Sequence, residues 1–442
     1  MLYPHQPTGR DWLAERSRAC LADEPGLGKT ITAITAADKA QAHSMLVIAP
    51  TCVVWNWHHE LDVWSPWRQP VVITSGRYAS LIEKADNVIV THGMLLNKDV
   101  RRAVCRKQWD LCVVDESHFF RGPRSKRSNI LMALDTIAEE CVAPMCERVW
   151  MLSGTPMPND PSDLWTMCHG MWPEEFTETY AEFRARYCLT CWTRYGDNVK
   201  VIGSKNTEEL RERLKGKILR RRTNDVLNLP PVRYETVALK PTKMPAEIGA
   251  LAEALPEHVQ RALLDPDLTP EDALELMGAN RAFAEYRRWC GLAKAEAVAE
   301  LLDFELKDKQ LDKVVVMAHH TDVVNIIADA LKRYGVRTIT GATSAADRTA
   351  NVKAFQERSD VRVMVCNIIA GGTGNTLTAS AELVFAEMSF VPGENTQAAI
   401  RIRRIGQERK CRIRFVSLAG TLDEPLVDVL RRKTDMINEV IK

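Results

Sequence analysis

The sequence predicts an α/β protein of two domains, each with a parallel sheet flanked by helices. Short apolar runs rich in β-branched residues alternate with helix-like stretches, as is typical of buried parallel strands. The alternation stops near residue 160 and returns near residue 310, which separates two such domains. A chain of 442 residues is long enough for two or three domains that each bury a core.

The expected strands fall into two groups. The first group lies at residues 44–50, 87–92, 111–117 and 148–154. The second lies at 313–320, 336–341, 361–367, 381–387 and 411–418. The residues between the groups are rich in helix formers and carry no comparable strand pattern.

The boundary between the domains is expected in the segment 228–241, because its two prolines favour an extended backbone and interrupt a helix. We therefore predict a first domain at 1–227, with a helical insertion at about 160–227. The second domain is predicted at 228–442, with a helical insertion at about 245–310 and a closing helix within 417–441.

The overall composition excludes several classes of protein. Fifty-nine Lys and Arg residues against 58 Asp and Glu give a net charge of +1, so the chain is neither a basic nucleic-acid tail nor an acidic disordered segment. No apolar run approaches the roughly 18 residues that span a bilayer. The N-terminus shows no basic region leading into an apolar stretch, so we expect a cytoplasmic protein.

The twelve cysteines are scattered, so we expect reduced thiols rather than disulfides. Cys188 and Cys191 form the one C-x-x-C of the sequence, and no second pair of ligands completes a zinc pattern.

Local charge departs from the neutral total in two segments. Residues 211–222 hold seven Lys and Arg against one Glu, and residues 251–276 hold seven Asp and Glu against one Arg. The basic segment either attracts a nucleic acid or pairs with the acidic segment, and both interpretations stay open.

The strongest local signal is ADEPGLGKTITAI at 22–34, which follows a short apolar stretch and opens a helix. Gly26 and Gly28 let backbone amides approach a polyphosphate, Lys29 can neutralise its charge and Thr30 can bind Mg²⁺. The strict phosphate-loop pattern has glycine where this chain has Asp23, so an ordinary glycine-rich turn at a helix start remains the alternative.

A second signal, VVDESH at 113–118, puts two carboxylates at the end of a buried strand. In a phosphate-hydrolysing site Asp115 would hold Mg²⁺ and Glu116 would orient the attacking water. An ordinary helix cap is the alternative for the same residues. Together the two motifs predict a site for a nucleotide polyphosphate and Mg²⁺.

At this point the chain resembles a known family. The phosphate loop, DESH, LSGTPMPN at 152–159 and QAAIRIRRIGQ at 397–407 resemble the ordered motifs of superfamily two helicases, specifically the Swi/Snf-type ATPases. The last motif matches the family pattern Q-x-x-x-R-x-x-R-x-G-Q at Gln397, Arg401, Arg404, Gly406 and Gln407. The resemblance implies two RecA-like P-loop lobes that close over ATP.

The resemblance also implies roles for residues of the ATP site. Gln6 reads the adenine, and Gly374 and Gln397 contact the nucleotide. Arg401 and Arg404 stabilise charge on the transferring phosphoryl group once the lobes close. A solvated or DNA-facing basic cluster is the alternative for these two arginines, and it is the favoured interpretation of Arg403, which lies off the motif.

The nucleic-acid side is implied by further motifs. Hydroxyls and backbone amides that bind phosphates without reading sequence are expected at Thr51, Trp55, Thr91, Gly371, Gly372 and Thr373. Ser153 and Thr155 are placed where hydrolysis is relayed to this side. The tryptophans at 55, 57, 64 and 67 form either a base-stacking platform or, as we expect, packing.

A narrower likeness lies in FRARYC at 183–188, LRRRTNDVLNLPPVR at 219–233 and VVVMAHHTDVV at 314–324. These segments resemble the annealing-helicase (SMARCAL-like) subgroup, in which Cys188 belongs to a helical insertion. From the positions of the first and last motifs we expect a minimal motor without accessory domains. We expect this motor to be a monomer of bacterial or phage type that works in the cytoplasm of a bacterium or of a phage-infected host.

The resemblance implies a DNA-stimulated ATPase that translocates on double-stranded or branched DNA and serves DNA remodelling, strand annealing or fork processing. One alternative is a strand-separating DNA or RNA helicase. The other is a nucleotide-gated recruitment module with little turnover.

Overall fold

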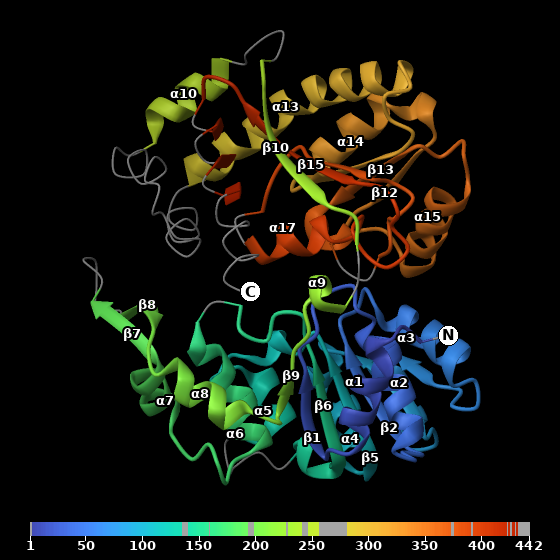
Figure 1. Ribbon diagram of the computed structural model, residues 1–442, viewed down its shortest axis with the longest axis vertical. Helices are drawn as coiled ribbons and strands as arrows, with labels where there is room; N and C mark the ends of the chain where they lie inside the picture. The colour runs from blue at the N-terminus through green and yellow to red at the C-terminus, as the bar shows by residue number, and fades with distance from the viewer. Residues whose placement is uncertain are drawn as a thin grey trace. The chain divides into compact units, whose positions relative to one another are not determined.

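The computed structural model describes residues 2–134, 140–158, 160–192, 199–226, 229–240, 246–255, 281–372, 375–389 and 392–421, with 423, 424, 427, 428, 430 and 431. The chain divides into two compact units, Met1–Val226 and Leu227–Lys442 (Figure 1). Each unit is described by itself below.

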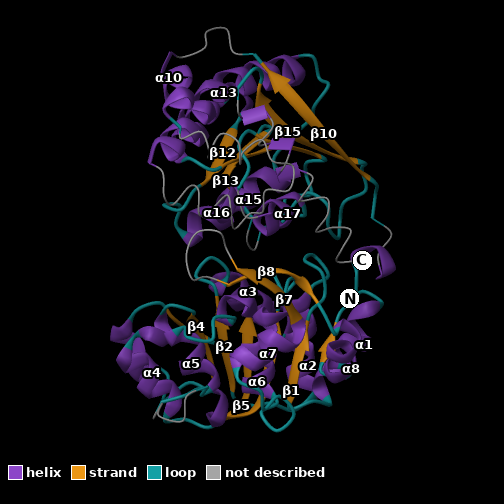
Figure 2. Ribbon diagram, turned by 90° about the vertical axis from the view of Figure 1, so that its left-hand side faces the viewer, coloured by secondary structure: helices purple, strands orange, loops and turns teal. Residues whose placement is uncertain are grey.

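Unit 1 is built on a seven-stranded sheet in which every strand pair is parallel (Figure 2). The strand order is β3-β4-β2-β5-β6-β1-β9. The strands are β1 (Arg18–Leu21), β2 (Met45–Ala49), β3 (Val71–Ile73), β4 (Asn87–Thr91), β5 (Trp109–Asp115), β6 (Cys146–Leu152) and β9 (Ile218–Leu219).

Helices cover both faces of this sheet. Neighbouring residues of a strand point to opposite faces, so Val47 and Leu46 belong to separate hydrophobic clusters. One face packs against α1 (His5–Ala14), α2 (Lys29–Lys39) and α3 (Val54–Trp64). The other packs against α4 (Lys98–Cys105), α5 (Lys126–Met132), α6 (Trp165–Met171), α7 (Tyr180–Tyr187) and α8 (Thr207–Leu214).

Unit 1 departs from the predicted helical insertion at 160–227. Besides helices, this region contains the antiparallel hairpin of β7 (Cys188–Trp192) and β8 (Val199–Ser204), and it contributes β9 to the main sheet. Cys188, expected within this helical insertion, begins strand β7. These strands were missed because the hairpin forms a separate two-stranded sheet and β9 has two residues, so neither gives the long apolar run of a buried strand.

Unit 2 has a six-stranded sheet, again with parallel pairs throughout, in the order β10-β15-β14-β11-β13-β12. Its strands are β10 (Val232–Leu239), β11 (Val314–Ala318), β12 (Val336–Ile339), β13 (Val363–Asn367), β14 (Glu382–Phe385) and β15 (Cys411–Leu418). Its helices include α10 (Ala246–Ala254), α13 (Arg281–Lys307), α14 (Thr321–Ala330), α15 (Ala345–Glu357), α16 (Ile368–Gly371) and α17 (Pro392–Ala399).

The segment predicted as a hinge, 228–241, contains a strand. β10 pairs with β15 along its whole length, from Val232 opposite Cys411 to Leu239 opposite Leu418. The two prolines precede the strand, and β10 lies at the edge of the sheet, where its half-buried residues give no continuous apolar run.

The two parallel sheets with helical layers confirm the α/β prediction, and a strand lies at each of the nine expected positions. Most of the predicted closing helix and most of the acidic segment 251–276 lie outside the described residues.

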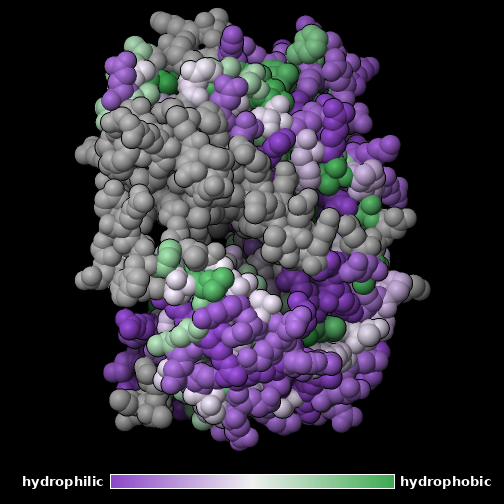
Figure 3. All heavy atoms as spheres, turned by 60° about the vertical axis from the view of Figure 1, so that its left-hand side comes forward, coloured by the Kyte–Doolittle hydropathy of each residue, from purple (hydrophilic) through white to green (hydrophobic). Residues whose placement is uncertain are grey.

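None of the helices in the described part of the chain combines the length and the hydrophobicity that a bilayer crossing requires. The described surface visible in Figure 3 is mostly hydrophilic, with hydrophobic residues in small groups.

Candidate nucleotide site

Three of the predicted motifs meet at one edge of the unit 1 sheet. β5, β6 and β1 are neighbours in the sheet and parallel, so their carboxyl ends lie at the same edge. The phosphate loop follows β1, DESH overlaps the end of β5, and SGTP follows β6. In open α/β sheets this is the edge at which ligands bind.

The phosphate loop has the backbone that its glycines allow. Gly26 and Gly28 have φ of 96° and 77°, in the region that side chains disfavour. A Cβ at Gly28 would lie 2.3 Å from Nε2 of Gln6. Gln6 is buried and donates to the carbonyl of Leu27 at 3.3 Å, so the predicted adenine reader packs directly against the loop.

The loop opens helix α2, which begins at Lys29 and has Gly28 at its N-cap without a side-chain cap. Such a helix N-terminus attracts anions. The Lys29 ammonium donates to the carbonyls of Asp23 at 2.7 Å and Glu24 at 3.4 Å. Thr30 follows on the first turn and is partly buried. The loop thus offers a cation, a hydroxyl and a helix N-terminus within a few residues.

Asp23, the departure from the strict loop pattern, is fully buried and pairs with Arg221. Arg221 follows β9, and its Nε donates to Oδ1 of Asp23 at 2.9 Å. Its backbone amide donates to the same oxygen at 3.1 Å. One residue further along the loop, the Glu24 carboxylate accepts from the amide of Thr223 at 2.7 Å. The segment after β9 therefore holds the phosphate loop in place.

The Asp115 carboxylate is anchored at both oxygens. Oδ1 accepts from the amide of Glu116 at 2.9 Å, and Oδ2 accepts from the indole Nε1 of Trp57 at 2.8 Å. Burial and the neighbouring Glu116 charge raise the pKa of Asp115 to about 6, while the Trp57 bond and the Lys29 charge act in the opposite direction. The influence of Lys29 on this carboxylate ties the loop and the DESH motif into one site.

His92, at the end of β4, contacts the same segment. Its Nε2 lies 2.9 Å from the backbone carbonyl of Asp115. Burial lowers the pKa of His92 to about 4, so the ring is neutral and donates to that carbonyl.

A short chain of contacts links DESH to SGTP. His118 Nδ1 lies 3.3 Å from a Glu116 carboxylate oxygen and 3.1 Å from Oγ of Ser153. The Ser153 hydroxyl oxygen also accepts from the amide of Thr155 at 3.1 Å. Glu116 has φ of 48°, a left-handed conformation that is uncommon for a residue with a side chain.

SGTP also touches the phosphate loop. A Cβ at Gly154 would lie 2.6 Å from Cγ of Pro25, so glycine is required where these two segments cross. The amide of Ser153 donates to the carbonyl of Leu21 at 3.2 Å, at the start of the loop. SGTP therefore contacts both the phosphate loop and DESH.

The candidate nucleic-acid residues of unit 1 are divided between surface and interior. Thr51 is exposed and Trp55 is 47% exposed, whereas Thr91 is buried and its hydroxyl accepts from the amide of Met94 at 3.2 Å. Trp57 lies in the core. Trp67 is 54% exposed, and the Arg68 guanidinium lies over its ring.

Unit 2 gathers the residues of the last motif around α17. Arg401 Nε donates to the carbonyl of Gln397 at 3.0 Å, and Arg404 donates to the carbonyl of Asn375 at 3.2 Å. Gln407 donates to the carbonyls of Thr378, Ser380 and Ile402. Arg403 donates to the carbonyl of Pro230, just before β10.

Gly371 and Gly372, at the end of α16, are buried. A Cβ added at Gly371 would lie 2.5 Å from Cβ of Cys366. A Cβ added at Gly372 would lie 2.5 Å from the carbonyl oxygen of Ile368. Close packing therefore accounts for both glycines. Thr373 and Gly374 lie outside the described residues.

The basic segment 211–222 is engaged within unit 1. Arg213 pairs with Glu178 at 2.6 Å, Lys217 with Glu175 at 2.8 Å and Lys215 with Glu212 at 2.8 Å. With the Asp23 pair of Arg221, these contacts account for four of its seven cations.

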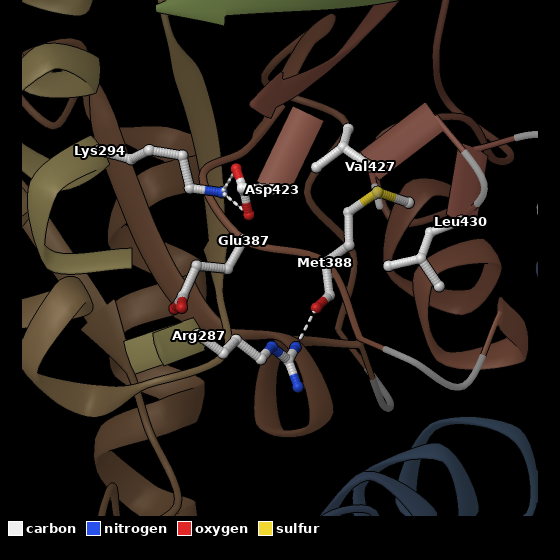
Figure 4. A pocket seen from close by; sticks show the side chains of 7 residues that line it. All are labelled: Arg287, Lys294, Glu387, Met388, Asp423, Val427 and Leu430. Atoms are coloured by element: carbon white, nitrogen blue, oxygen red, sulfur yellow. Dashed lines mark hydrogen bonds and ion pairs between the residues drawn. The ribbon is translucent and has the colours of Figure 1, made fainter. Parts of the chain in front are cut away.

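A small pocket in unit 2 is lined by buried charges (Figure 4). Lys294 and Asp423 are 2% and 6% exposed, and their charged groups lie 2.9 Å apart. Glu387 accepts from the backbone amides of His319 and His320 at 2.9 Å each, at the start of α14. Because cations and anions face each other here, the pocket is an internally neutralised part of the core.

Four residues of the unit 1 site were missed: Trp57, His92, His118 and Arg221. His118 lies inside the DESH motif, and Arg221 lies inside a segment singled out for its resemblance, so both had a signal. Trp57 and His92 each follow a named candidate, but nothing in the sequence pairs them with Asp115.

The chain is similar to known protein families and to solved structures. The SNF2-related domain matches residues 5–250, more than half of the chain, and the helicase conserved C-terminal domain matches residues 293–406. A solved structure titled "Sulfolobus solfataricus SWI2/SNF2 ATPase core in complex with dsDNA" is 22% identical, with a TM-score of 0.46, and covers all of this chain and 93% of that chain.

Curated relatives match over nearly the whole chain. The SWI/SNF-related matrix-associated actin-dependent regulator of chromatin subfamily A-like protein 1 of Xenopus tropicalis is 31% identical over 99% of this chain. The DNA annealing helicase and endonuclease ZRANB3 of Homo sapiens is 28% identical over 100% of it. The chain spans 45% and 40% of the lengths of these two relatives, and 62% of a Caenorhabditis elegans homolog that is 29% identical over 99% of this chain. The match of the SNF2-related domain over more than half of its length shows that the chain belongs to the SNF2-related family.

Proposed function

We propose that the protein is an ATP-dependent DNA translocase that couples ATP hydrolysis to movement on double-stranded or branched DNA. The observation that carries the proposal is the contact of SGTP with both the phosphate loop and DESH, at the carboxyl edge of one parallel sheet. This arrangement supplies a cation, a hydroxyl and two carboxylates to one phosphate-binding loop. The name of one relative, the DNA annealing helicase and endonuclease ZRANB3, favours strand annealing as the use of such movement. DNA remodelling and fork processing are proposed beside it from the family resemblance.

The residues of unit 1 fit a nucleotide with Mg²⁺. The left-handed Gly28, which leaves no room for a Cβ, and the N-terminus of α2 suit a polyphosphate. Among the described residues no group of three or more His, Cys, Asp and Glu side chains could hold a metal by itself. Mg²⁺ commonly uses one or two protein ligands and takes others from phosphates and water, so Thr30 and Asp115 suffice. When bound, the ion neutralises phosphate charge.

Each residue then has a role. Gln6 recognises the base, Gly26 and Gly28 admit the phosphates, and Lys29 neutralises them. Glu116 orients and polarises the attacking water, and His118 fixes the Glu116 carboxylate. Ser153 and Thr155 relay the state of this site, because Ser153 contacts both His118 and Thr155.

Residues 1–227 and 228–442 are proposed as the ATP-binding lobe and the helicase C-terminal lobe. Gln397, Gly374, Arg401 and Arg404 of the second lobe are proposed to serve the same nucleotide. An arginine that reaches the phosphoryl group upon closure typically raises the rate about 10³- to 10⁵-fold.

DNA is the proposed partner, held by its backbone without sequence readout. Thr51 and Trp55 are exposed, which supports them as contacts in unit 1. The other proposed DNA contacts rest on the family motifs and would use backbone groups. They are Thr91, Gly371, Gly372 and Thr373. A monomer in the cytoplasm of a bacterium or of a phage-infected host stays a prediction.

The test is ATP hydrolysis with and without duplex, forked and single-stranded DNA. We expect duplex or forked DNA to stimulate hydrolysis, and no stimulation by any DNA overturns the proposal. Lys29→Ala and Glu116→Gln should abolish turnover. Lys215→Ala is the matched control, because Lys215 is exposed and pairs with Glu212 on its own helix end.

Two further measurements separate the alternatives. Displacement of a triplex strand without duplex unwinding supports translocation, and the reverse supports a strand-separating DNA or RNA helicase. If Glu116→Gln retains biological activity while Lys29→Ala abolishes it, the protein is a nucleotide-gated recruitment module.

A further inference from the structure

We propose that Trp57 is a positioning residue that fixes the Asp115 carboxylate for Mg²⁺ and ties it to helix α3. The inference rests on the proposed function, because it assigns Asp115 to the metal. It concerns a residue that none of the sequence motifs assigns to the nucleotide site.

The geometry gives Trp57 one polar contact, and that contact is Asp115. The indole is fully buried in the cluster between α2, α3 and the sheet. Its Nε1–H is its only hydrogen-bond donor, and it reaches Oδ2 of Asp115 at 2.8 Å. A buried indole N–H is costly to leave unpaired, so this bond fixes both partners.

The carboxylate is thereby held in one orientation. The amide of Glu116 binds Oδ1 at 2.9 Å, while the indole binds Oδ2. An ionised carboxylate has about four acceptor positions, so two remain for a metal-bound water. The two anchors set where those positions point.

The backbone beneath this carboxylate is held as well. His92 Nε2 lies 2.9 Å from the Asp115 carbonyl, and Asp115 is opposite Leu152 in the β5–β6 register. The side-chain torsions are therefore the main remaining freedom, and Trp57 restricts them.

Helix α3 also carries a proposed DNA contact on its other face, opposite the Trp57–Asp115 hydrogen bond. Trp55 lies two positions before Trp57, about 200° around the helix, and is 47% exposed. The residue proposed to touch DNA and the residue that holds the metal carboxylate thus share one rigid turn. A displacement of α3 is transmitted to Asp115 by a single hydrogen bond.

The experiment compares Trp57→Phe with Trp150→Phe in the full chain. Both tryptophans are fully buried in the same cluster, and Trp150 donates its Nε1–H to the Arg16 carbonyl at 2.9 Å, away from Asp115. Each variant loses one hydrogen bond of a buried indole N–H and a similar volume. The readout is equilibrium binding of ADP at increasing Mg²⁺, which requires no turnover.

We expect Trp57→Phe to raise the Mg²⁺ midpoint about 10- to 100-fold, as loss of a ligand's hydrogen-bond partner commonly does. ADP affinity without Mg²⁺ should stay at the wild-type value, and Trp150→Phe should leave both quantities unchanged. If Trp57→Phe leaves the Mg²⁺ midpoint unchanged, or shifts it no more than Trp150→Phe, the inference is overturned. If wild-type protein binds Mg·ADP but hydrolyses no ATP, the proposed function fails. The Mg²⁺ midpoints of the wild type and the two variants still decide this inference in that case.

Discussion

Arg221 donates through Nε to Oδ1 of Asp23 at 2.9 Å, although 198 positions separate the two residues in the chain. Asp23 is fully buried, and its partner is 12% exposed. The pair joins the start of the phosphate loop to the last strand of unit 1.

Removing the cation from this pair should destabilise unit 1. Arg221→Met leaves a buried carboxylate without its counter-charge, and such changes typically cost about 3–5 kcal/mol of unfolding free energy. Urea denaturation of the full chain measures the loss, with the exposed Arg211→Met as the control. The double variant Asp23→Asn/Arg221→Met should recover part of it, because no buried charge remains. A single variant as stable as the control would contradict the assignment.

Gly28 and Gly216 provide a matched pair, because both have φ of 77°. Alanine at either position incurs roughly 1–2 kcal/mol of left-handed strain. Only at Gly28 does the new Cβ meet another side chain, at 2.3 Å from Nε2 of Gln6, whereas nothing lies within 4 Å at Gly216. We expect Gly28→Ala to weaken ADP binding about tenfold or more, equivalent to about 1.4 kcal/mol, and Gly216→Ala to leave it unchanged. Equal affinities in fluorescence titrations would refute the role of the loop.

Arg404 and Arg403 are neighbours with different expected roles. Arg404→Ala should lower kcat about 10³-fold or more with little change in ADP affinity, because its charge is proposed to act on the transferring phosphoryl group. Arg403→Ala should lower kcat far less, since Arg403 lies off the family motif and donates to the Pro230 carbonyl beside β10. Single-turnover hydrolysis with DNA present measures both. Comparable losses in the two variants would show that position in the motif does not determine the role.

The folded protein should lose stability as the pH is lowered, because His319 resists protonation in the folded state. Burial, with the nearby charges of Arg287 and His320, lowers the pKa of His319 from 6.5 to about 4, while Glu387 acts in the opposite direction. Below pH 6.5 the unfolded chain therefore takes up a proton that the folded chain does not, and stability declines until about pH 4. At about 1.4 kcal/mol per pKa unit the loss is at most about 3.5 kcal/mol, and solvent screening of the partly exposed ring makes it smaller.

Thermal unfolding of wild type and His319→Asn across this pH range measures the effect. The variant should lose less stability on acidification than wild type, whereas the exposed His59→Asn should behave like wild type. Glu387 adds a second loss at lower pH: burial alone would raise its pKa, but His320 and Lys294 lower it below 4.5. Parallel pH profiles for His319→Asn and wild type would exclude His319 as the cause.

The sequence was most informative where strands are buried on both faces. β2 and β11 are continuous apolar runs with every residue buried, so their positions could be predicted. β9 has two residues and β10 is a half-buried edge strand, so neither has that pattern. Both are stabilised by pairing with strands distant in the chain, which local sequence does not encode.

The candidate site divides in the same way. Lys29 and Asp115 follow from motifs, because the chemistry of a phosphate site requires those groups directly after strands. Trp57 was expected to serve packing, but the identity of its partner depends on how α3 packs against β5. The pairing of Asp23 with Arg221 depends on β9 lying beside β1.

The position of β9 has a consequence for biosynthesis. A ribosome releases β1 and the phosphate loop first, and Arg221 follows 198 residues after Asp23. Until then β1 lacks one of its two neighbours and Asp23 lacks its counter-ion. Nascent chains that stop before β9 should therefore be sensitive to protease at the loop, and resistance should appear once the ribosome has released Arg221.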